Sequence, residues 1–155
     1  METQAKDIIR NRRATFDYEI EDRYEAGIVL AGSEVKSLRS GLVELVDAYA
    51  SVEKGEAWLK QMRIAPWPMA KSFPHEPNRP RKLLLHAHEI EALVKATQRQ
   101  GYTIVPMRLY FDQNGRVKVE LAVARGKTKG DKRQSIKKKE AEREAREAIK
   151  RGRRE

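Results

Sequence analysis

Two apolar runs joined by a short polar turn constrain the fold of this chain more than any other feature. Residues 102–111 read YTIVPMRLYF, the turn reads DQNG, and the run RVKVELAVA follows and ends at Ala124. In the second run the apolar residues recur at every other position from Val117 to Val123, which is the period of a strand with one buried face. The sequence therefore predicts a β-hairpin over residues 102–124.

Four further strands are predicted upstream of this hairpin. Residues 16–22 alternate Phe16, Tyr18 and Ile20 with acidic residues, and AGIVLAG at 26–32 resembles a second, more buried strand. Two extended runs, 48–53 and 57–64, flank Lys54, Gly55 and Glu56 and predict another hairpin. Residues 66–80 hold five of the six prolines, so they are expected to form a long irregular loop.

Two helices are predicted between these strands. In the first, Ser33 is expected to cap the N-terminus and Gly41 to end the helix. Its pattern places Val35 and Leu38 on a buried face and leaves Glu34, Lys36 and Arg39 in solvent. The second helix spans 86–99, with Gly101 as its stop. About six strands with two helices predict a mainly β fold, closed as a small β-barrel.

Composition bounds the size of the core and the kind of partner. With 155 residues, 39% hydrophobic and 36% charged, the chain has material for one ordinary core and a charged extension. The 33 Lys and Arg exceed the 23 Asp and Glu by 10, which indicates a polyanionic partner, most often nucleic acid. No run of 18 apolar residues and no signal-peptide core occurs, so a cytoplasmic protein without membrane contact is expected. The absence of cysteine excludes disulfides and thiolate zinc sites.

The composition changes sharply at the C-terminus. Residues 131–155 contain 11 Lys and Arg and 6 Asp and Glu, and therefore carry half of the net charge. The stripe of Ala141, Ala145, Ala148 and Ile149 is too thin to dock firmly on a core. We therefore expect a flexible N-terminus over 1–10, one domain over 11–130, and a basic tail over 131–155 that is disordered alone and helical with an anionic partner.

Motifs for catalysis or metal binding are weak. The two histidines of HAHE at 86–89 diverge on a helix, so a solvated helix start explains them better than a metal site. Asp17 and Glu19 alternate with apolar residues and lack a nucleophile nearby in sequence. The segment ARGKTKGDKR has glycines among basic residues, which suits phosphate contact, but it lacks the spacing of a P-loop. We expect neither enzymatic activity nor a cofactor.

Several motifs together resemble one known family. They are NRRA at 11–14, YEAGIVLAGSEVKSLRSG at 24–41, RKLLLHAHEI at 81–90, GYTIVPMRLYF at 101–111, and VKVELAVARGK with DKR at 117–133. In order and in content they resemble the SmpB family, the SsrA-binding proteins. The resemblance implies an oligonucleotide-binding-like barrel with two or three embedded helices and no activity of its own. It also implies binding to the tRNA-like domain of transfer-messenger RNA and rescue of stalled bacterial ribosomes.

The resemblance assigns roles to individual residues. Those that match the family's RNA-binding pattern are Asn11, Arg12, Arg13, Tyr18, Glu25, His86, Lys118, Arg125, Gly126 and Lys127. Glu25 is expected to accept hydrogen bonds from base or ribose groups, although a carboxylate paired with a nearby Arg is the alternative. Tyr18 belongs either to this surface or to the core. Glu34 is expected to be structural, at the first turn of its helix.

In the tail, the ribosome-binding residues implied by the resemblance are Asp131, Lys132, Arg133, Ile136, Lys137, Lys138 and Lys139. The chain departs from the family pattern at Thr128, Gly130 and Ala141, where many members have a basic or aromatic residue. These departures put stacking contacts at those points in doubt.

The partners implied are transfer-messenger RNA, the 70S ribosome with its decoding centre and mRNA channel, alanyl-tRNA synthetase and elongation factor Tu. Two alternatives stay open. A general single-stranded RNA-binding barrel would need a row of exposed aromatics, which is hard to find among 10 aromatic residues. A ribosomal structural protein would share the charge and the tail.

Overall fold

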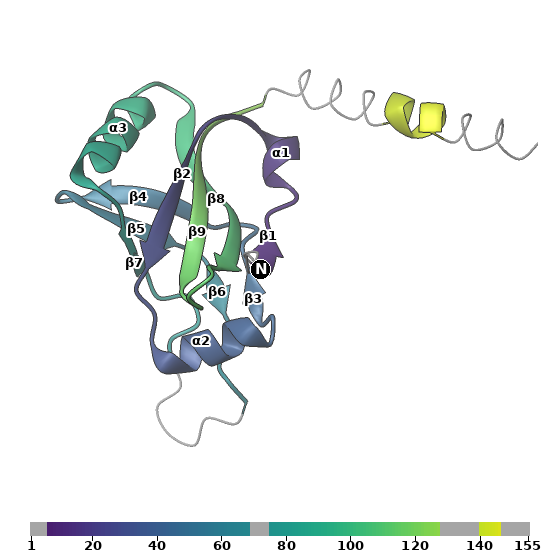
Figure 1. Cartoon of the computed structure of the whole chain (residues 1–155). Helices are drawn as coiled ribbons and strands as arrows, with labels where there is room; N and C mark the ends of the chain where they lie inside the picture. The colour runs from purple at the N-terminus through teal and green to yellow at the C-terminus, as the bar shows by residue number, and fades with distance from the viewer. Residues whose placement is uncertain (1–5, 69–74, 128–139, 147–155) are drawn as a thin grey trace, which may run out of the picture.

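The fold is a closed β-barrel with helices at its ends and on one side (Figure 1). The computed structural model describes residues 6–68, 75–127 and 140–146. The seven-stranded sheet has the order β1-β8-β4-β5-β7-β2-β9, and β9 also pairs with β8. Its strands are β1 (Lys6–Arg10), β2 (Tyr18–Ile28), β4 (Tyr49–Glu53), β5 (Glu56–Lys60), β7 (Arg81–Leu84), β8 (Tyr102–Phe111) and β9 (Val117–Gly126).

Closure of the barrel depends on β8. One edge of β8 pairs with β9, whereas the other edge pairs with β4 at Ile104 and with β1 from Arg108 to Phe111. Six strands of the described chain therefore form a ring, and β1 extends the sheet beside β8. This arrangement confirms the small barrel of about six strands predicted from the sequence.

The predicted β8–β9 hairpin is confirmed, and its two faces are both buried along part of their length. Val117, Val119, Leu121 and Val123 point into the barrel, as their spacing predicted. On the opposite face, Ala122 and Ala124 pack with Val105 and Met107 in a second, smaller cluster. The short helix α1 (Ala14–Asp17) covers this cluster through Ala14, which is 1% exposed. Thus α1 is anchored on the outside of the hairpin.

The N-terminal half of the barrel differs from the sequence prediction at two points. In place of the two strands expected at 16–22 and 26–32, one continuous strand, β2, runs from Tyr18 to Ile28, because β9 pairs with it from Tyr18 to Gly27. Phe16 lies in α1 instead, residues 29–31 are not in a strand, and Gly32 begins α2. Residues 6–10, expected to belong to a flexible N-terminus, form β1. Ile8 and Ile9 pack against the core, which explains why this strand is held on β8.

The predicted hairpin around Gly55 is confirmed, but its second strand is shorter than expected. Lys54 and Gly55 both have positive φ, 52° and 78°, as a two-residue hairpin turn requires. The run 57–64 is interrupted at Gln61, whose φ is 62°. Beyond this residue, β6 (Arg63–Ile64) leaves the barrel sheet and pairs with β3 (Val43–Glu44).

Two helices lie at opposite ends of the barrel (Figure 1). Helix α3 (Ala87–Thr97) confirms the helix predicted at 86–99, and Leu93 contributes to the main core. Helix α2 (Gly32–Arg39) contributes Leu38 to the same core. Gly41, with φ of 72°, donates its N–H to the Leu38 carbonyl and ends α2, as predicted. Among the described residues, no helix combines the length and apolar character needed to span a bilayer.

At the N-terminus of α2, the capping role predicted for Ser33 and the solvent exposure predicted for Glu34 both differ from the structure. Ser33 does not cap the helix; its hydroxyl is hydrogen bonded to His75 Nδ1 at 2.9 Å. The cap comes from Glu34, whose Oε1 accepts the Ala31 N–H at 2.9 Å. Glu34 was also expected in solvent, yet it is 0% exposed. Its structural role at the first turn of the helix is the part of the expectation that agrees with the structure.

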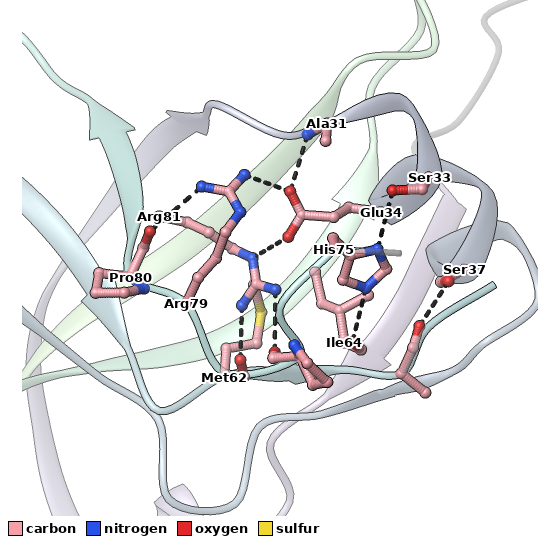
Figure 2. Close-up of polar contacts among 12 residues, drawn as sticks. Ala31, Ser33, Glu34, Ser37, Met62, Ile64, His75, Arg79, Pro80 and Arg81 are labelled. Carbon is pink, nitrogen blue, oxygen red and sulfur yellow. Dashed lines mark hydrogen bonds and ion pairs between the residues drawn. The ribbon is translucent and has the colours of Figure 1, made fainter. Parts of the chain in front are cut away.

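The buried carboxylate of Glu34 is neutralised by two arginines that lie close together in sequence and far from Glu34 (Figure 2). Arg79 Nη2 and Arg81 Nε donate to its two carboxylate oxygens. Arg81 is itself 0% exposed, and its remaining nitrogens donate to the carbonyls of Met62 at 2.7 Å and Pro77 at 3.1 Å. This network fixes α2 against the start of β7.

Candidate nucleic-acid interface

Basic residues gather where the end of β9 meets α1. Lys127 donates its backbone N–H to Asp17 O at 2.9 Å and its ammonium group to Thr15 O at 3.0 Å. Arg12 and Arg13, which directly precede α1, are exposed. The structure therefore brings together three of the predicted site residues from both ends of the domain.

Asn11 holds this corner on the barrel. Its backbone N–H donates to Met107 O at 2.8 Å, and its side-chain amide donates to Pro106 O at 3.1 Å. Asn11 Nδ2 donates one of its two N–H groups within the protein, so the side chain can offer a ligand the second N–H and its carbonyl oxygen. Asn11 thus also positions the arginines that follow it.

The last residues of β9 lie beside the first residues of β2. Tyr18 is paired with Gly126 and Glu19 with Arg125, and the side chains of the latter two form an ion pair. A Cβ added at Gly126 would meet nothing within 4 Å. Packing within the protein therefore does not require glycine here, whereas close approach of a ligand backbone would favour it.

Tyr18 lies at the border between the core and the surface. Its ring packs half-buried against the small cluster around Ala14 and Met107. It also lines a groove together with Asn11, Arg13 and Tyr49. Tyr49 is 39% exposed and was not singled out from the sequence, because its alternation with Ala50 and Val52 resembles ordinary strand packing.

Glu25 lies on the outer face of the barrel with Lys118 and Tyr110 from the next two strands. Its carboxylate Oε2 accepts a hydrogen bond from the Tyr110 hydroxyl, so the expected alternative, pairing with an arginine, is not what the structure shows. Burial, followed by the hydrogen bond to Glu25, raises the pKa of Tyr110, which stays a donor. Within the described chain, Glu25 Oε1 accepts no hydrogen bond, and the residue is exposed. One carboxylate oxygen is thus held in place and the other faces solvent.

His86 is the cap residue of α3 and is exposed. Strand β7 ends at Leu84, which pairs with Gly27 of β2, so His86 follows two residues after this pair. The His86 ring stacks on His88, with centroids 5.6 Å apart. In the part of the chain that the structure describes, no group of three or more His, Cys, Asp or Glu is arranged to hold a metal ion.

The outer face also carries a set of alternating charges that the sequence did not reveal. Asp7, Arg108, Glu120 and Arg23 are linked in that order across β1, β8, β9 and β2. The alternation of Lys118 and Glu120 with apolar residues on β9 is a signal in the sequence that could have pointed to this face. The pairing itself joins residues up to 101 positions apart, which periodicity does not show.

The predicted tail residues Asp131, Lys132, Arg133, Ile136, Lys137, Lys138 and Lys139 lie outside the described residues, as do Thr128 and Gly130. Residues 140–146 are helical, and their side chains, including Ala141, are exposed.

The fold and the charge on its outer face define a basic barrel of the oligonucleotide-binding-like class. A family model described as SmpB protein matches residues 8–151. The chain belongs to the SmpB family.

Relatives and a solved structure agree with this assignment. The chain is 51% identical over 146 residues to the SsrA-binding protein of Geobacillus thermodenitrificans, covering 94% of each chain. It is 53% identical over 148 residues to that of Thermobifida fusca, covering 96% of this chain and 92% of the relative. A chain of the solved structure "tmRNA-SmpB: a journey to the center of the bacterial ribosome" superposes with a TM-score of 0.68 at 44% identity, covering 83% of this chain and 93% of that chain.

Proposed function

We propose that this protein binds the tRNA-like domain of transfer-messenger RNA and delivers it to stalled bacterial ribosomes for trans-translation. The observation that carries the proposal is the family match over residues 8–151, which includes every candidate RNA-binding residue. The relatives are named for binding SsrA, and the similar solved structure joins tmRNA, SmpB and the ribosome in its description. The protein acts as an RNA-binding adaptor.

The candidate residues divide into two kinds by their chemistry. Arg12, Arg13 and Lys127 supply positive charge at the α1 corner, which suits phosphate oxygens and carries little sequence information. Glu25 is an acceptor, held by Tyr110, and suits base amino or imino groups and the ribose 2′-OH. This division separates positioning of the RNA from recognition of its shape and identity.

The finer parts of the proposal rest on the family resemblance. The protein works in the cytoplasm, with alanyl-tRNA synthetase and elongation factor Tu acting on the same RNA. Its tail, 131–155, occupies the mRNA channel beyond the decoding centre. A general single-strand binder is less favoured, because Tyr49 is the one aromatic among the exposed large hydrophobic residues of the described chain.

Substitution of Glu25 tests the proposed recognition. We expect Glu25→Gln to weaken binding to the tRNA-like domain about tenfold, because an acceptor for the RNA is lost. The dependence of log affinity on log salt should stay nearly unchanged, since Glu25 neutralises no phosphate. Lys127→Ala should instead lower that slope by about 0.9. Fluorescence anisotropy with labelled RNA over a salt series measures both quantities.

The control for Glu25→Gln is Glu44→Gln, which makes the same change at an exposed position on β3. It should leave affinity and slope as in the wild type. An unchanged affinity for Glu25→Gln would remove Glu25 from the interface. Failure of the wild-type protein to prefer this RNA over an unrelated hairpin of equal length would contradict the proposed function itself.

A further inference from the structure

A continuous row of ion pairs among five charged side chains crosses the outer face of the barrel. In order it contains Arg10, Asp7, Arg108, Glu120 and Arg23. Arg108 is its centre: Nη1 donates to Asp7 and Nε donates to Glu120 at 3.0 Å. Arg10 also binds Asp7, and Arg23 also binds Glu120, so each of these two carboxylates binds two guanidinium groups.

The charges of these five side chains do not cancel. Three arginines face two carboxylates, and exposed Arg12 lines the same groove as Arg10, Arg23 and Arg108. Burial raises the pKa values of Asp7 and Glu120, but hydrogen bonds from the arginines outweigh it and lower both. Both groups are therefore ionised at neutral pH, which leaves the groove with two positive charges in excess.

The carboxylates orient the arginines without using up their donors. Arg10 binds Asp7 through Nε, and Arg23 binds Glu120 through Nη1, so each keeps further N–H groups on its planar fork. Their side chains are 64% and 54% exposed, whereas that of Arg108 is 26% exposed. A guanidinium that is already oriented loses less conformational entropy when it binds a phosphate.

The groove adjoins the residues assigned above to RNA recognition. Asn11 and Arg12 are among the residues that line it. Arg108 also lines the groove; its guanidinium lies over the Tyr110 ring, 4.2 Å from the centroid, and the Tyr110 hydroxyl donates to Glu25. A strand of RNA in contact with both the α1 corner and Glu25 would therefore pass along this groove.

We infer that the groove binds the phosphodiester backbone of the RNA, with Arg10, Arg12 and Arg23 as ligands of the non-bridging phosphate oxygens. Arg108 is a positioning residue that holds Asp7 and Glu120 between the outer arginines. The inference rests on the proposed function, since it assigns a second contact to the same RNA. It extends the interface from the α1 corner across β1, β8, β9 and β2.

The test compares two double variants of the full chain with equal net charge. In the groove variant, Arg12→Gln with Arg23→Gln, two phosphate contacts are removed. In the control variant, Arg39→Gln with Arg63→Gln, the same charge is removed from exposed positions on α2 and β6. Affinity for the tRNA-like domain is measured over a salt series. For the groove variant, the plot of log affinity against log salt concentration should be less steep by about 1.8, and the affinity at 0.1 M salt should fall at least about tenfold.

The control variant should keep the wild-type slope and bind within about twofold of the wild type, because distant charges are screened at this ionic strength. Equal losses for the two variants would overturn the inference and indicate a response to net charge alone. Full retention of affinity by the groove variant would overturn it as well. The proposed function is tested separately, by whether the wild type prefers this RNA to an unrelated hairpin. Thermal unfolding of both variants verifies that they are folded.

Discussion

Replacement of Glu34 by Ala is expected to lower the free energy of unfolding by about 3–5 kcal/mol, because it leaves a buried guanidinium without its counter-charge. Arg81 is 0% exposed, and its other donors are already satisfied by the Met62 and Pro77 carbonyls (Figure 2). The Arg81 side chain has no contact with bulk solvent in the wild-type fold. The substitution also removes the cap on the Ala31 N–H. Urea unfolding followed by circular dichroism measures the loss.

A double substitution separates loss of the charge pair from loss of packing. Glu34→Leu with Arg81→Met removes both charges and fills the space with apolar groups, so it should be much less destabilising than Glu34→Ala. Glu44→Ala, at an exposed glutamate, should change stability by less than about 0.5 kcal/mol. A Glu34→Ala protein as stable as the Glu44→Ala protein would contradict the assigned role of the network.

The same pair makes stability depend on acid pH. Burial raises the pKa of Glu34, but the hydrogen bonds from Arg79, the Ala31 N–H and Arg81 together lower the pKa below its ordinary value. A lowered folded-state pKa means that the stabilisation is complete above the unfolded-state pKa and is lost as pH falls through the folded-state value. Burial also lowers the pKa of Arg81, yet a guanidinium stays cationic throughout this range. The stability difference between wild type and Glu34→Ala should therefore shrink below about pH 4.

Local patterns in the sequence predicted helices and strands well where one face is buried and the other is exposed to solvent. The β8–β9 hairpin and helix α3 follow their apolar periods, and Gly41 and Gly55 occur at the positive φ angles that their turns need. Patterns failed where burial depends on partners far away in sequence. Glu34 alternates with other charged residues and resembles a solvent-facing position, but Arg79 and Arg81 lie 45 and 47 residues later.

The prediction of two strands in place of β2 has a similar cause. The alternating pattern ends at Asp22 and the apolar run starts at Ala26, so the two segments resemble separate strands, but β9 pairs with β2 from Tyr18 through Gly27 and keeps it extended. A Cβ at Gly27 would lie 3.3 Å from Leu84 Cβ on the neighbouring strand β7. The glycine therefore serves close packing between strands, which a single-sequence pattern does not distinguish from a turn.

For the candidate interface, the resemblance supplied residues whose chemistry the sequence alone left open. Glu25 and His86 are 61 positions apart, and the segments that carry them are joined only by the pairing of β7 with β2. The partner of Glu25 is Tyr110, a residue that its apolar neighbours mark as core. Its ring is buried while its hydroxyl reaches the outer face, a division within one side chain that strand periodicity does not predict.

The tail prediction depends on length and charge. A helix over the 25 residues 131–155 would extend about 37 Å. That length suits a narrow channel lined by phosphate, such as the mRNA path of a ribosome without message. The 6 acidic residues among 11 basic ones keep the tail from binding every RNA equally well. Residues 140–146 already form a helix with exposed side chains, which leaves its surface available to a partner.

Truncation after Gly130 is therefore expected to abolish peptide tagging on stalled ribosomes while affinity for transfer-messenger RNA stays within a few-fold of the full chain. Ala145→Pro keeps the length and charge of the tail but breaks its helix, so it should also reduce tagging strongly. Tagging is measured in a reconstituted translation reaction on a message without a stop codon, and RNA affinity by anisotropy. Normal tagging by the truncated protein would refute a channel-sensing tail. A loss of RNA affinity as large as the loss of tagging would instead place the tail in the RNA clamp, with the barrel groove and the tail holding the same molecule.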